Sequence, residues 1–180
     1  MNEYNDLEIM RRVQSGETQL MGILYERHKL NLFNYFLRCT NSRAKSEDMV
    51  HNVFLKVMKN VKHFNGTGEF KYWLFRIARN IWIDNTKKKE PMLKAVSIDH
   101  VQMDNDHQDE TGDRSMKELQ KIKLQKALRC LSEEKRDAII LSRYQGLDYK
   151  TIAEISNCTE SAVKSRIMRG LGEIRKLVNS

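Results

Sequence analysis

The stretch DYKTIAEISNCTESAVKSRIMRG, residues 148–170, decides the fold that this sequence predicts. Asp148 and Thr159 belong to the residue types that most often cap helix N-termini, so they indicate the starts of two helices. Asn157 lies between them and tolerates the left-handed backbone of a tight turn. The small side chain of Ala153 lets the two helices approach closely. This spacing predicts a helix–turn–helix, and a plain helical hairpin is the alternative.

The second helix of this motif has an inward and an outward face. Val163, Ile167 and Leu171 recur at helical spacing and are expected to point into the core. The side chains expected to meet base edges and phosphates of DNA are Thr159, Ser161, Lys164, Ser165, Met168 and Arg169. The alternative for the two basic residues is phosphate attraction without sequence reading, and for the methionine it is chance exposure of one apolar side chain.

Charge divides the chain into three parts. Its 180 residues suit one or two small domains, and a net charge of +8 favours a polyanionic partner. Residues 1–90 hold 16 Lys+Arg and 10 Asp+Glu, residues 116–180 hold 14 and 8, but residues 91–115 hold only 2 and 6. The middle part also lacks hydrophobic periodicity, whereas nearly all the rest has the period of a helix. We therefore predict an all-α protein in which two small helical domains, 1–90 and 116–180, are joined by a flexible acidic linker, 91–115.

Cap residues and helix breakers set the expected helix boundaries. Asp6 and Ser46 are expected to cap the first and third helices, and Ser132 to cap a helix in the C-terminal domain. Pro91 is expected to end the fourth helix. The turn between the third and fourth helices is expected at NGTG, residues 65–68.

The fourth expected helix, EFKYWLFRIARNIWID at residues 69–84, mixes apolar and cationic side chains. Its charges exclude a membrane span, which needs about 20 apolar residues in succession. On a helical projection the core face is expected to hold Phe70, Trp73, Leu74, Ile77 and Ile81. The opposite face holds Tyr72, Arg76, Arg79 and Asn80. That face is either an ordinary solvated surface or one that handles nucleic acid.

Several classes of site are disfavoured by the residue pattern. The three cysteines are far apart and form no CxxC pair, so neither a disulfide framework nor a zinc site is indicated. His100 and His107 lie among acidic residues of the linker, where solvation is favoured over metal binding. The start MNEYNDLEIM lacks the pattern of a secretion signal. We expect a cytoplasmic protein with no metal, no cofactor and no membrane insertion.

Four segments occur in a diagnostic order over nearly all of both predicted domains. They are SGETQLMGILYERH (15–28), SEDMVHNVFLKV (46–57), FKYWLFRIARNIWID (70–84), and LSEEKRDAIILSRYQGLDYKTIAEIS (131–156) leading into SAVKSRIMRGLGEIRK (161–176). By these segments the chain resembles the sigma-70 family of bacterial transcription initiation factors. The resemblance is to the small extracytoplasmic-function group, which has only domains two and four.

The resemblance implies that the third helix binds core RNA polymerase. The residues expected to make this contact are Asp48, His51, Asn52 and Leu55. The usual family pattern at these positions is Asp-x-x-Gln-Glu. His51 and Asn52 stand in place of the Gln and the Glu, so this chain brings one negative charge fewer to the expected contact with a basic coiled coil of the polymerase. The alternative for Asp48 is a charge near the helix start that favours the helix dipole.

The resemblance also implies two contacts with promoter DNA. The fourth helix and its preceding loop would read the downstream element, where strand opening exposes single bases. The residues expected there are Asn65, Gly66, Tyr72, Arg76, Arg79 and Asn80. Arg76 and Ile77 replace the tryptophan pair of housekeeping members, so stricter promoter choice is expected. The helix–turn–helix would read the upstream element as duplex.

Partners follow from the same resemblance: core RNA polymerase, promoter DNA and an anti-sigma factor that masks the polymerase-binding surfaces. Residues 91–115 would either enter the RNA channel of the polymerase or act as a soluble tether. Two other functions compete, a dimeric helix–turn–helix repressor or activator and a DNA-processing enzyme such as a recombinase. The resemblance of the third helix to a polymerase-binding helix argues against the repressor or activator. The carboxylates are scattered rather than clustered, which argues against the DNA-processing enzyme.

Overall fold

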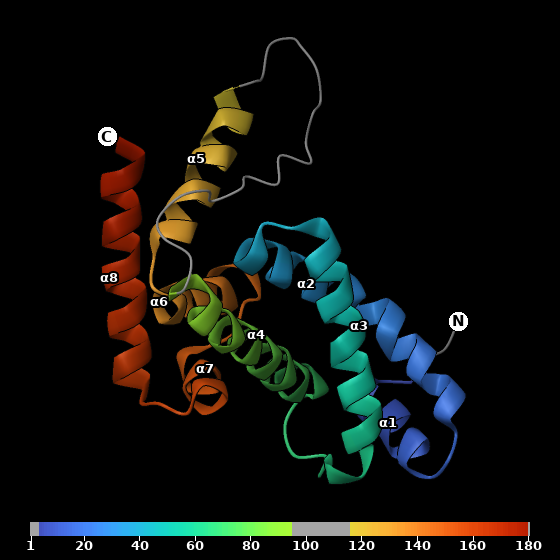
Figure 1. The fold of residues 1–180 in the computed structure, drawn as a ribbon. Coiled ribbons are helices and arrows are strands. Elements are labelled where there is room, and N and C mark those ends of the chain that lie inside the picture. The colour runs from blue at the N-terminus through green and yellow to red at the C-terminus, as the bar shows by residue number, and fades with distance from the viewer. Residues whose placement is uncertain (1–3, 95–115, 180) are drawn as a thin grey trace.

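The computed structural model describes residues 4–94 and 116–179, and every element within these ranges is a helix (Figure 1). The N-terminal module, residues 4–94, contains α1 (Asp6–Gln14), η1 (Thr18–Leu20), α2 (Met21–Thr40), α3 (Arg43–Asn60), η2 (Val61–His63) and α4 (Phe70–Lys94). The C-terminal module, residues 116–179, contains α5 (Met116–Cys130), α6 (Glu133–Ile139), η3 (Ile140–Tyr144), α7 (Tyr149–Ser156) and α8 (Glu160–Asn179). The predicted all-α class is confirmed. In these two ranges no helix is apolar over a length that would cross a bilayer.

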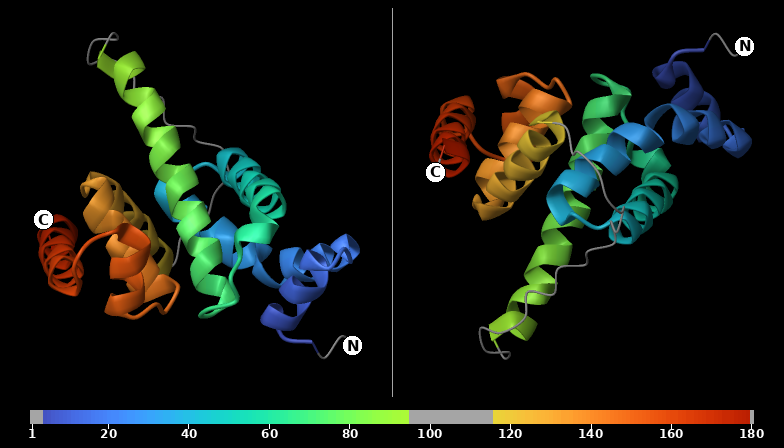
Figure 2. Two further views of the ribbon diagram at one scale, coloured as in Figure 1. Left: turned by 90° about the horizontal axis from the view of Figure 1, so that it is seen from below. Right: turned by 90° about the horizontal axis from the view of Figure 1, so that it is seen from above.

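Helix α4 belongs to the N-terminal module and lies between the other helices of that module and the C-terminal module. Figure 2 shows it with α3 on one side and the helices of the C-terminal module on the other. It packs against α2 and α3 and also against α7. The buried apolar residues consequently form one continuous core, from Ile9 in α1 to Ile174 in α8.

The starts of α1 and α3 differ from the sequence predictions. Asn5, not Asp6, caps α1, because Asn5 has the extended backbone of a cap and its side chain accepts from the Glu8 N–H at 2.9 Å. Ser42, not Ser46, caps α3, and its hydroxyl oxygen accepts from the Lys45 N–H at 3.4 Å. A serine four residues further on lies inside the helix and cannot meet its free N–H groups.

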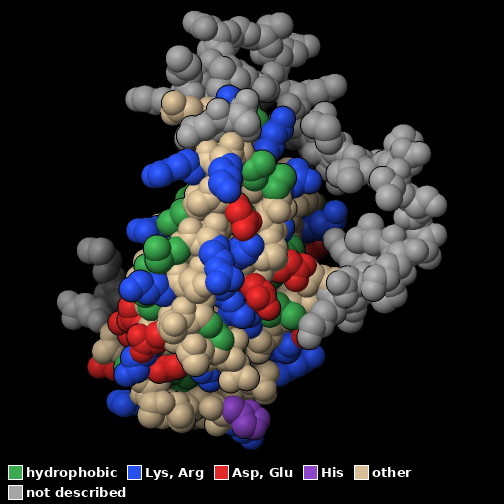
Figure 3. All heavy atoms as spheres, turned by 90° about the vertical axis from the view of Figure 1, so that its left-hand side faces the viewer, with side chains coloured by type: hydrophobic (Ala, Val, Ile, Leu, Met, Phe, Trp, Pro, Cys, Tyr) green, Lys and Arg blue, Asp and Glu red, His purple; other side chains and the backbone are tan. Residues whose placement is uncertain are grey.

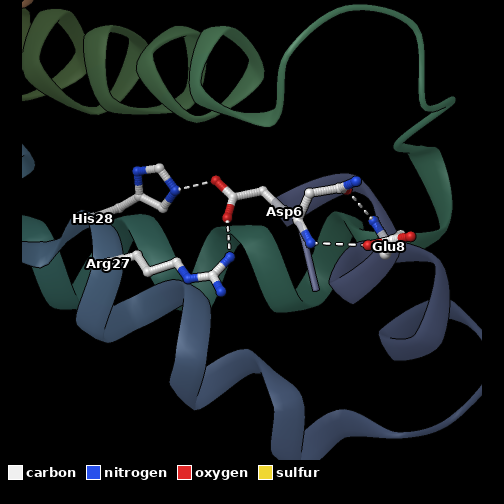
Figure 4. A network of polar contacts seen from close by, with 5 residues as sticks. Asp6, Glu8, Arg27 and His28 are labelled. Carbon is white, nitrogen blue, oxygen red and sulfur yellow. Dashed lines mark hydrogen bonds and ion pairs between the residues drawn. The ribbon is translucent and has the colours of Figure 1, made fainter. Parts of the chain in front are cut away.

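Asp6, which was predicted to cap α1, contacts α2 instead. Asp6 begins α1 and points toward α2, where its carboxylate accepts from Arg27 Nη1 at 2.8 Å and lies 2.5 Å from His28 Nε2 (Figure 4). His28 is buried, and its ring packs edge-on against Phe70 of α4. Asp6 of α1 therefore contacts His28 of α2, which in turn packs against Phe70 of α4.

Burial along α4 is broader than the predicted apolar stripe. Phe70, Leu74 and Ile81 are buried as predicted, but Trp73 and Ile77 are only partly buried. Phe75, Ala78 and Trp82 are buried instead. The projection assumed a single core face, whereas α4 is covered by helices of both modules.

The end of α4 also differs from its prediction. The helix continues past Pro91 to Lys94. Proline removes only its own N–H and disturbs one earlier carbonyl, so one further turn of helix is tolerated at this end. Residues 95–115, most of the predicted linker, lie outside the described residues, and so do His100 and His107.

The predicted helix–turn–helix is confirmed. Asp148 caps α7, with its carboxylate accepting from the Thr151 N–H at 2.7 Å. Asn157 has the left-handed backbone of the turn, with φ of 49°. The Thr159 hydroxyl accepts from the Ala162 N–H at 3.2 Å at the start of α8. Each of these roles was assigned correctly from residue type and spacing.

Two details of the C-terminal module depart from expectation. Ser132 stands at the N-cap of α6, but its side chain makes no capping hydrogen bond. Val163 and Ile167 are buried as predicted, whereas Leu171 is 37% exposed. The backbone of Gly170 approaches α6 so closely that a Cβ there would lie 2.7 Å from an α6 side-chain atom. This glycine takes the inward position, and the next apolar contact of α8 is Ile174.

Candidate nucleic-acid interface

The residues predicted for the second helix of the helix–turn–helix lie together on the outer side of α8. We call Thr159, Ser161, Lys164, Ser165, Met168 and Arg169 the α8 face. All are exposed except Ser165, which is half-buried, and the large apolar side chain of Met168 is 65% exposed. Figure 3 shows Lys and Arg side chains spread over the side of the molecule that α8 forms, interspersed with Asp and Glu. An exposed, cationic helix after a tight turn has the shape and charge to enter a major groove.

Arg166 positions this face, although it was not among the predicted site residues. Its Nη1 lies 3.3 Å from the Cys158 Sγ in the turn, and its Nη2 lies 3.3 Å from a carboxylate oxygen of Glu134 on α6. The side chain thereby fixes α8 against α6 and the turn. Sequence spacing could not separate this brace from a DNA contact, because the partner on α6 lies 32 residues earlier in the chain.

The loop before α4 holds its predicted turn. Gly66 and Gly68 have φ of +70° and +76°, a backbone that favours glycine. The Asn65 side-chain oxygen accepts from the Thr67 N–H at 3.1 Å and from the Thr67 hydroxyl at 2.8 Å. Asn65 itself is exposed, at the start of the predicted downstream-element surface.

The predicted residues of α4 do not share one open surface. We call Asn65, Gly66, Tyr72, Arg76, Arg79 and Asn80 the α4 face. Arg76 and Asn80 are exposed and Tyr72 is half-buried. Arg79 is turned toward the C-terminal module, and its side chain is only 13% exposed. The prediction that all four helix residues face outward is therefore wrong for Arg79 in this arrangement, because a carboxylate of the other module binds it.

That carboxylate belongs to Asp137 of α6, which is buried. Its Oδ2 accepts from Arg79 Nε at 2.6 Å, and its Oδ1 accepts from the Tyr35 hydroxyl at 2.7 Å. Burial raises the pKa of Asp137, while Arg79 and Tyr35 act in the opposite direction. Burial likewise holds the pKa of the Tyr35 hydroxyl well above its usual range. We call Tyr35, Arg79 and Asp137 the inter-module triad.

Further polar contacts join the modules around this triad. Lys71 of α4 donates from Nζ to the Gln145 carbonyl oxygen at 2.7 Å. The Arg38 guanidinium lies 4.1 Å from the centroid of the Tyr144 ring, within cation–π range. These contacts were not predicted, because nothing local to either residue identifies its partner in the other module.

The residues predicted to bind polymerase lie together on the exposed side of α3. We call Asp48, His51, Asn52 and Leu55 the α3 face. Leu55 is 47% exposed and borders a groove of about 320 Å³ between α2 and α3. The groove is lined by Met21, Gly22, Tyr25, His51, Phe54 and Leu55. An exposed apolar groove of this kind can take apolar side chains of a partner polypeptide.

Metal binding finds no support in the described part of the chain. Across residues 4–94 and 116–179, no three His, Cys, Asp or Glu side chains come together as a metal site would require.

Comparison with known protein families assigns both modules. The family model "Sigma-70 region 2" matches residues 24–91, and the model "Sigma-70, region 4" matches residues 121–174. The chain belongs to the sigma-70 family. The region 2 match contains the α3 and α4 faces, and the region 4 match contains the α8 face. Asp6 lies before the region 2 match, so α1 and its contact with α2 are additional to it.

Individual relatives place this sigma factor in the extracytoplasmic-function group. It is 25% identical to the ECF RNA polymerase sigma factor BldN of Streptomyces coelicolor, over 96% of this chain and 65% of BldN. It is 24% identical to the RNA polymerase sigma-H factor of Pseudomonas aeruginosa, over 98% of this chain and 95% of that protein. Its fold is similar to the sigma factor RpoE of Bartonella quintana, crystallised with the anti-sigma factor NepR. The TM-score is 0.67 at 26% identity, covering 84% of this chain and 91% of RpoE.

Proposed function

We propose that this sigma factor binds core RNA polymerase, directs it to specific promoters and aids strand opening there. The observation that carries the proposal is the combination, in one chain, of sigma-70 regions 2 and 4 with a helix–turn–helix whose recognition helix is exposed. Such a factor acts by binding alone. The polymerase supplies the chemistry.

The α3 face is the proposed contact with core polymerase. Its carboxylate, Asp48, meets a basic partner, and the groove beside Leu55 takes apolar side chains from that partner. His51 and Asn52 contribute hydrogen bonds in place of the second acidic charge that other members carry.

Two surfaces are proposed to read DNA, each in a different form. The α8 face enters the major groove of the upstream element, where Lys164 and Arg169 meet phosphates and base edges. The α4 face receives single bases of the opened downstream element. Tyr72 offers a ring for stacking, and Arg76 and Asn80 offer hydrogen-bond donors.

An anti-sigma factor is the remaining proposed partner. The similar sigma factor RpoE was crystallised with one, and the exposed apolar groove on the α3 face is a surface that a masking protein would cover. The complex with core polymerase places the protein in the cytoplasm. The α8 face is proposed to determine which promoters the sigma factor recognises.

Co-elution with sigma-free core polymerase on size exclusion tests the proposal. The wild-type chain should co-elute, and Asp48→Arg should abolish co-elution by placing a cation against a basic partner. Glu154→Arg is the matched control, since it makes the same charge change at an exposed position of the other module. Failure of the wild type to co-elute, together with tight binding of duplex DNA by the free protein, would favour a helix–turn–helix repressor instead.

A further inference from the structure

We propose that Gln14, the last residue of α1, is a positioning residue for reading of the downstream promoter element. It holds the start of the loop formed by residues 65–69, which we call the reading loop. Gln14 lies before the region 2 match, which begins at residue 24, and it was not among the predicted site residues. The inference rests on the proposed function, because Asn65 and Gly66 of the reading loop belong to the α4 face.

Gln14 joins two segments that are far apart in the sequence. Its side-chain Nε2 donates to the Val61 carbonyl oxygen at 2.9 Å and to the Phe64 carbonyl oxygen at 2.7 Å, 47 and 50 positions further along the chain. An amide nitrogen carries two hydrogens, one for each of these acceptors. The Val61 oxygen also accepts from the Phe64 N–H at 3.2 Å. Gln14 therefore holds the closing turn of η2, which leads into the reading loop, and α1 lies beside this segment (Figure 1).

The Phe64 carbonyl belongs to the peptide group at which the reading loop begins. A peptide group is planar, so a hydrogen bond to this oxygen also sets the direction of the Asn65 N–H and of the chain that follows. The Phe64 side chain is buried, and its ring packs against Trp73 of α4 with the centroids 5.1 Å apart. The backbone of Phe64 is thus fixed by α1 and its side chain by α4.

The middle of the reading loop stands clear of other segments. A Cβ on Gly66 or Gly68 would meet nothing within 4 Å beyond its chain neighbours, and both glycines have positive φ. This open space leaves room for an unstacked base. A glycine-rich segment also loses much conformational entropy when it is ordered, so a loop that is held before DNA arrives binds at a lower entropic cost.

Helix α1 gives Gln14 a rigid support. Met10 and Val13 are buried in the core, and Asp6 contacts His28 of α2. Gln14 directly follows Val13, so its backbone is fixed by the packing of the helix. A side chain on a packed helix holds its partners more precisely than one on a loop does.

The test replaces Gln14 with methionine, which keeps the length of the side chain and removes both donors without adding charge. Holoenzyme, assembled from core polymerase and the full-length chain, selects from a pool of random-sequence single-stranded DNA about 20 nucleotides long. Gln14→Met should bind the best wild-type sequence about fivefold more weakly. Its affinity for the unselected pool should fall by less than about twofold, because phosphate contacts remain. Gln19→Met, the same substitution at an exposed position of η1, should match the wild type.

A conservative variant separates loss of the hydrogen bonds from other effects of the substitution. Gln14→Lys retains donors at a similar reach, so it should recover most of the preference for the selected sequence over the pool. Gln19→Lys adds the same charge on η1 and measures the effect of charge alone. Asn65→Ala removes the side-chain oxygen that accepts from Thr67. Adding Gln14→Met to Asn65→Ala should lower the preference less than Gln14→Met does alone, because both act through one loop.

Hydrogen exchange in the free chain reports on the loop without DNA. The Thr67 N–H donates to the Asn65 side-chain oxygen, and the Thr151 N–H donates to the Asp148 carboxylate in the other module. Gln14→Met should speed exchange of the Thr67 N–H several-fold and leave that of the Thr151 N–H unchanged, since only the first lies in the loop that Gln14 holds.

The two readouts together decide the proposal. Wild-type sequence preference in Gln14→Met would overturn it, whether or not exchange at Thr67 is faster, because the order of the loop would then not matter for reading. Equal losses on the selected sequence and on the pool would also overturn it, since a general weakening is not a reading defect. A wild type that enriches no sequence would instead refute the proposed function, and the reading role of Gln14 with it, while exchange at Thr67 would still show whether Gln14 orders the loop.

Discussion

Asp6 shows how the role of one carboxylate depends on its partners. The hydrogen bond with His28 lowers the pKa of Asp6, burial opposes it, and the hydrogen bond from Arg27 adds to the lowering. The charged form is therefore favoured in the folded state. We expect Asp6→Asn to reduce the free energy of unfolding by about 1 kcal/mol at pH 7, a value discounted because the Asp6 side chain is 26% exposed.

The pH dependence of that loss follows from the sign of the shift. A carboxyl group whose pKa is lower when folded stabilises the fold above its unfolded pKa, about 4, and this contribution is lost as the pH falls through the folded pKa. Urea unfolding should therefore show a wild-type advantage at pH 7 that shrinks below about pH 4. Glu26→Gln, an exposed acid on α2, is the control and should change little. A difference that is constant with pH would exclude the ionic contact as its cause.

Arg169 is the residue of the α8 face that we expect to read sequence. If its guanidinium binds a base edge in bidentate fashion, Arg169→Ala should cost about 1–3 kcal/mol at the cognate promoter and relax the preference at one base pair. Holoenzyme binding to the cognate promoter and to its single-base variants measures this. Arg175→Ala, which removes an exposed cation further along α8, should lower affinity evenly. An even loss for Arg169→Ala as well would assign Arg169 to a phosphate.

At the scale of elements, substitution by alanine is expected to have opposite effects on stability at two glycines of α8. A Cβ at Gly170 would lie 2.7 Å from Ile139 Cδ1 and 3.3 Å from Lys135 Cβ, both on α6. Overpacking of this kind costs typically about 1–3 kcal/mol, more than the roughly 1 kcal/mol that alanine adds to helix propensity. At Gly172 nothing lies within 4 Å. Gly170→Ala should lower the melting temperature, and Gly172→Ala should raise it.

The pair of variants makes its own control, since the substitution, the helix and the propensity gain are the same. Thermal unfolding followed by circular dichroism measures both. If Gly170→Ala were as stabilising as Gly172→Ala, the close approach of α8 to α6 would not exist in solution.

Local signals explain which elements the sequence predicted correctly. The helix–turn–helix was correct in its caps and its turn, because Asp148, Asn157 and Thr159 each act on backbone groups within a few residues. The cap errors at Asp6 and Ser46 also have a local cause. In both places another residue with capping ability precedes the chosen one, and residue type alone does not say which has extended backbone.

Contacts between distant segments explain what the sequence did not predict. The spacing of α4 separated apolar from polar positions, but it could not show that Arg79 would meet a residue 58 positions away. The Tyr35 hydroxyl meets the same carboxylate across 102 positions. In contrast, the α3 and α8 faces were predicted as groups, because helical periodicity alone brings their residues together.

For the whole molecule, the shared core and the inter-module triad predict that the two modules unfold together. One hydrophobic core includes residues of both modules, and the Asp137 carboxylate of one module accepts from Tyr35 and Arg79 of the other. Opening the contact would break the ion pair between Arg79 and Asp137 and would expose apolar surface of α4 to water. In scanning calorimetry the wild type should show a single transition, with a van't Hoff enthalpy equal to the calorimetric one.

Asp137→Asn should weaken this coupling. With the ion pair removed, each module should unfold at its own temperature. The van't Hoff enthalpies of the two transitions should be about three fifths and two fifths of the total for residues 4–94 and 116–179, since unfolding enthalpy scales with the number of residues. Asp148→Asn, which removes the same charge from an exposed position of the same module, should keep the single transition. Two separate transitions in the wild type would mean that the modules are independent in solution, and Arg79 would then be free to bind DNA at all times.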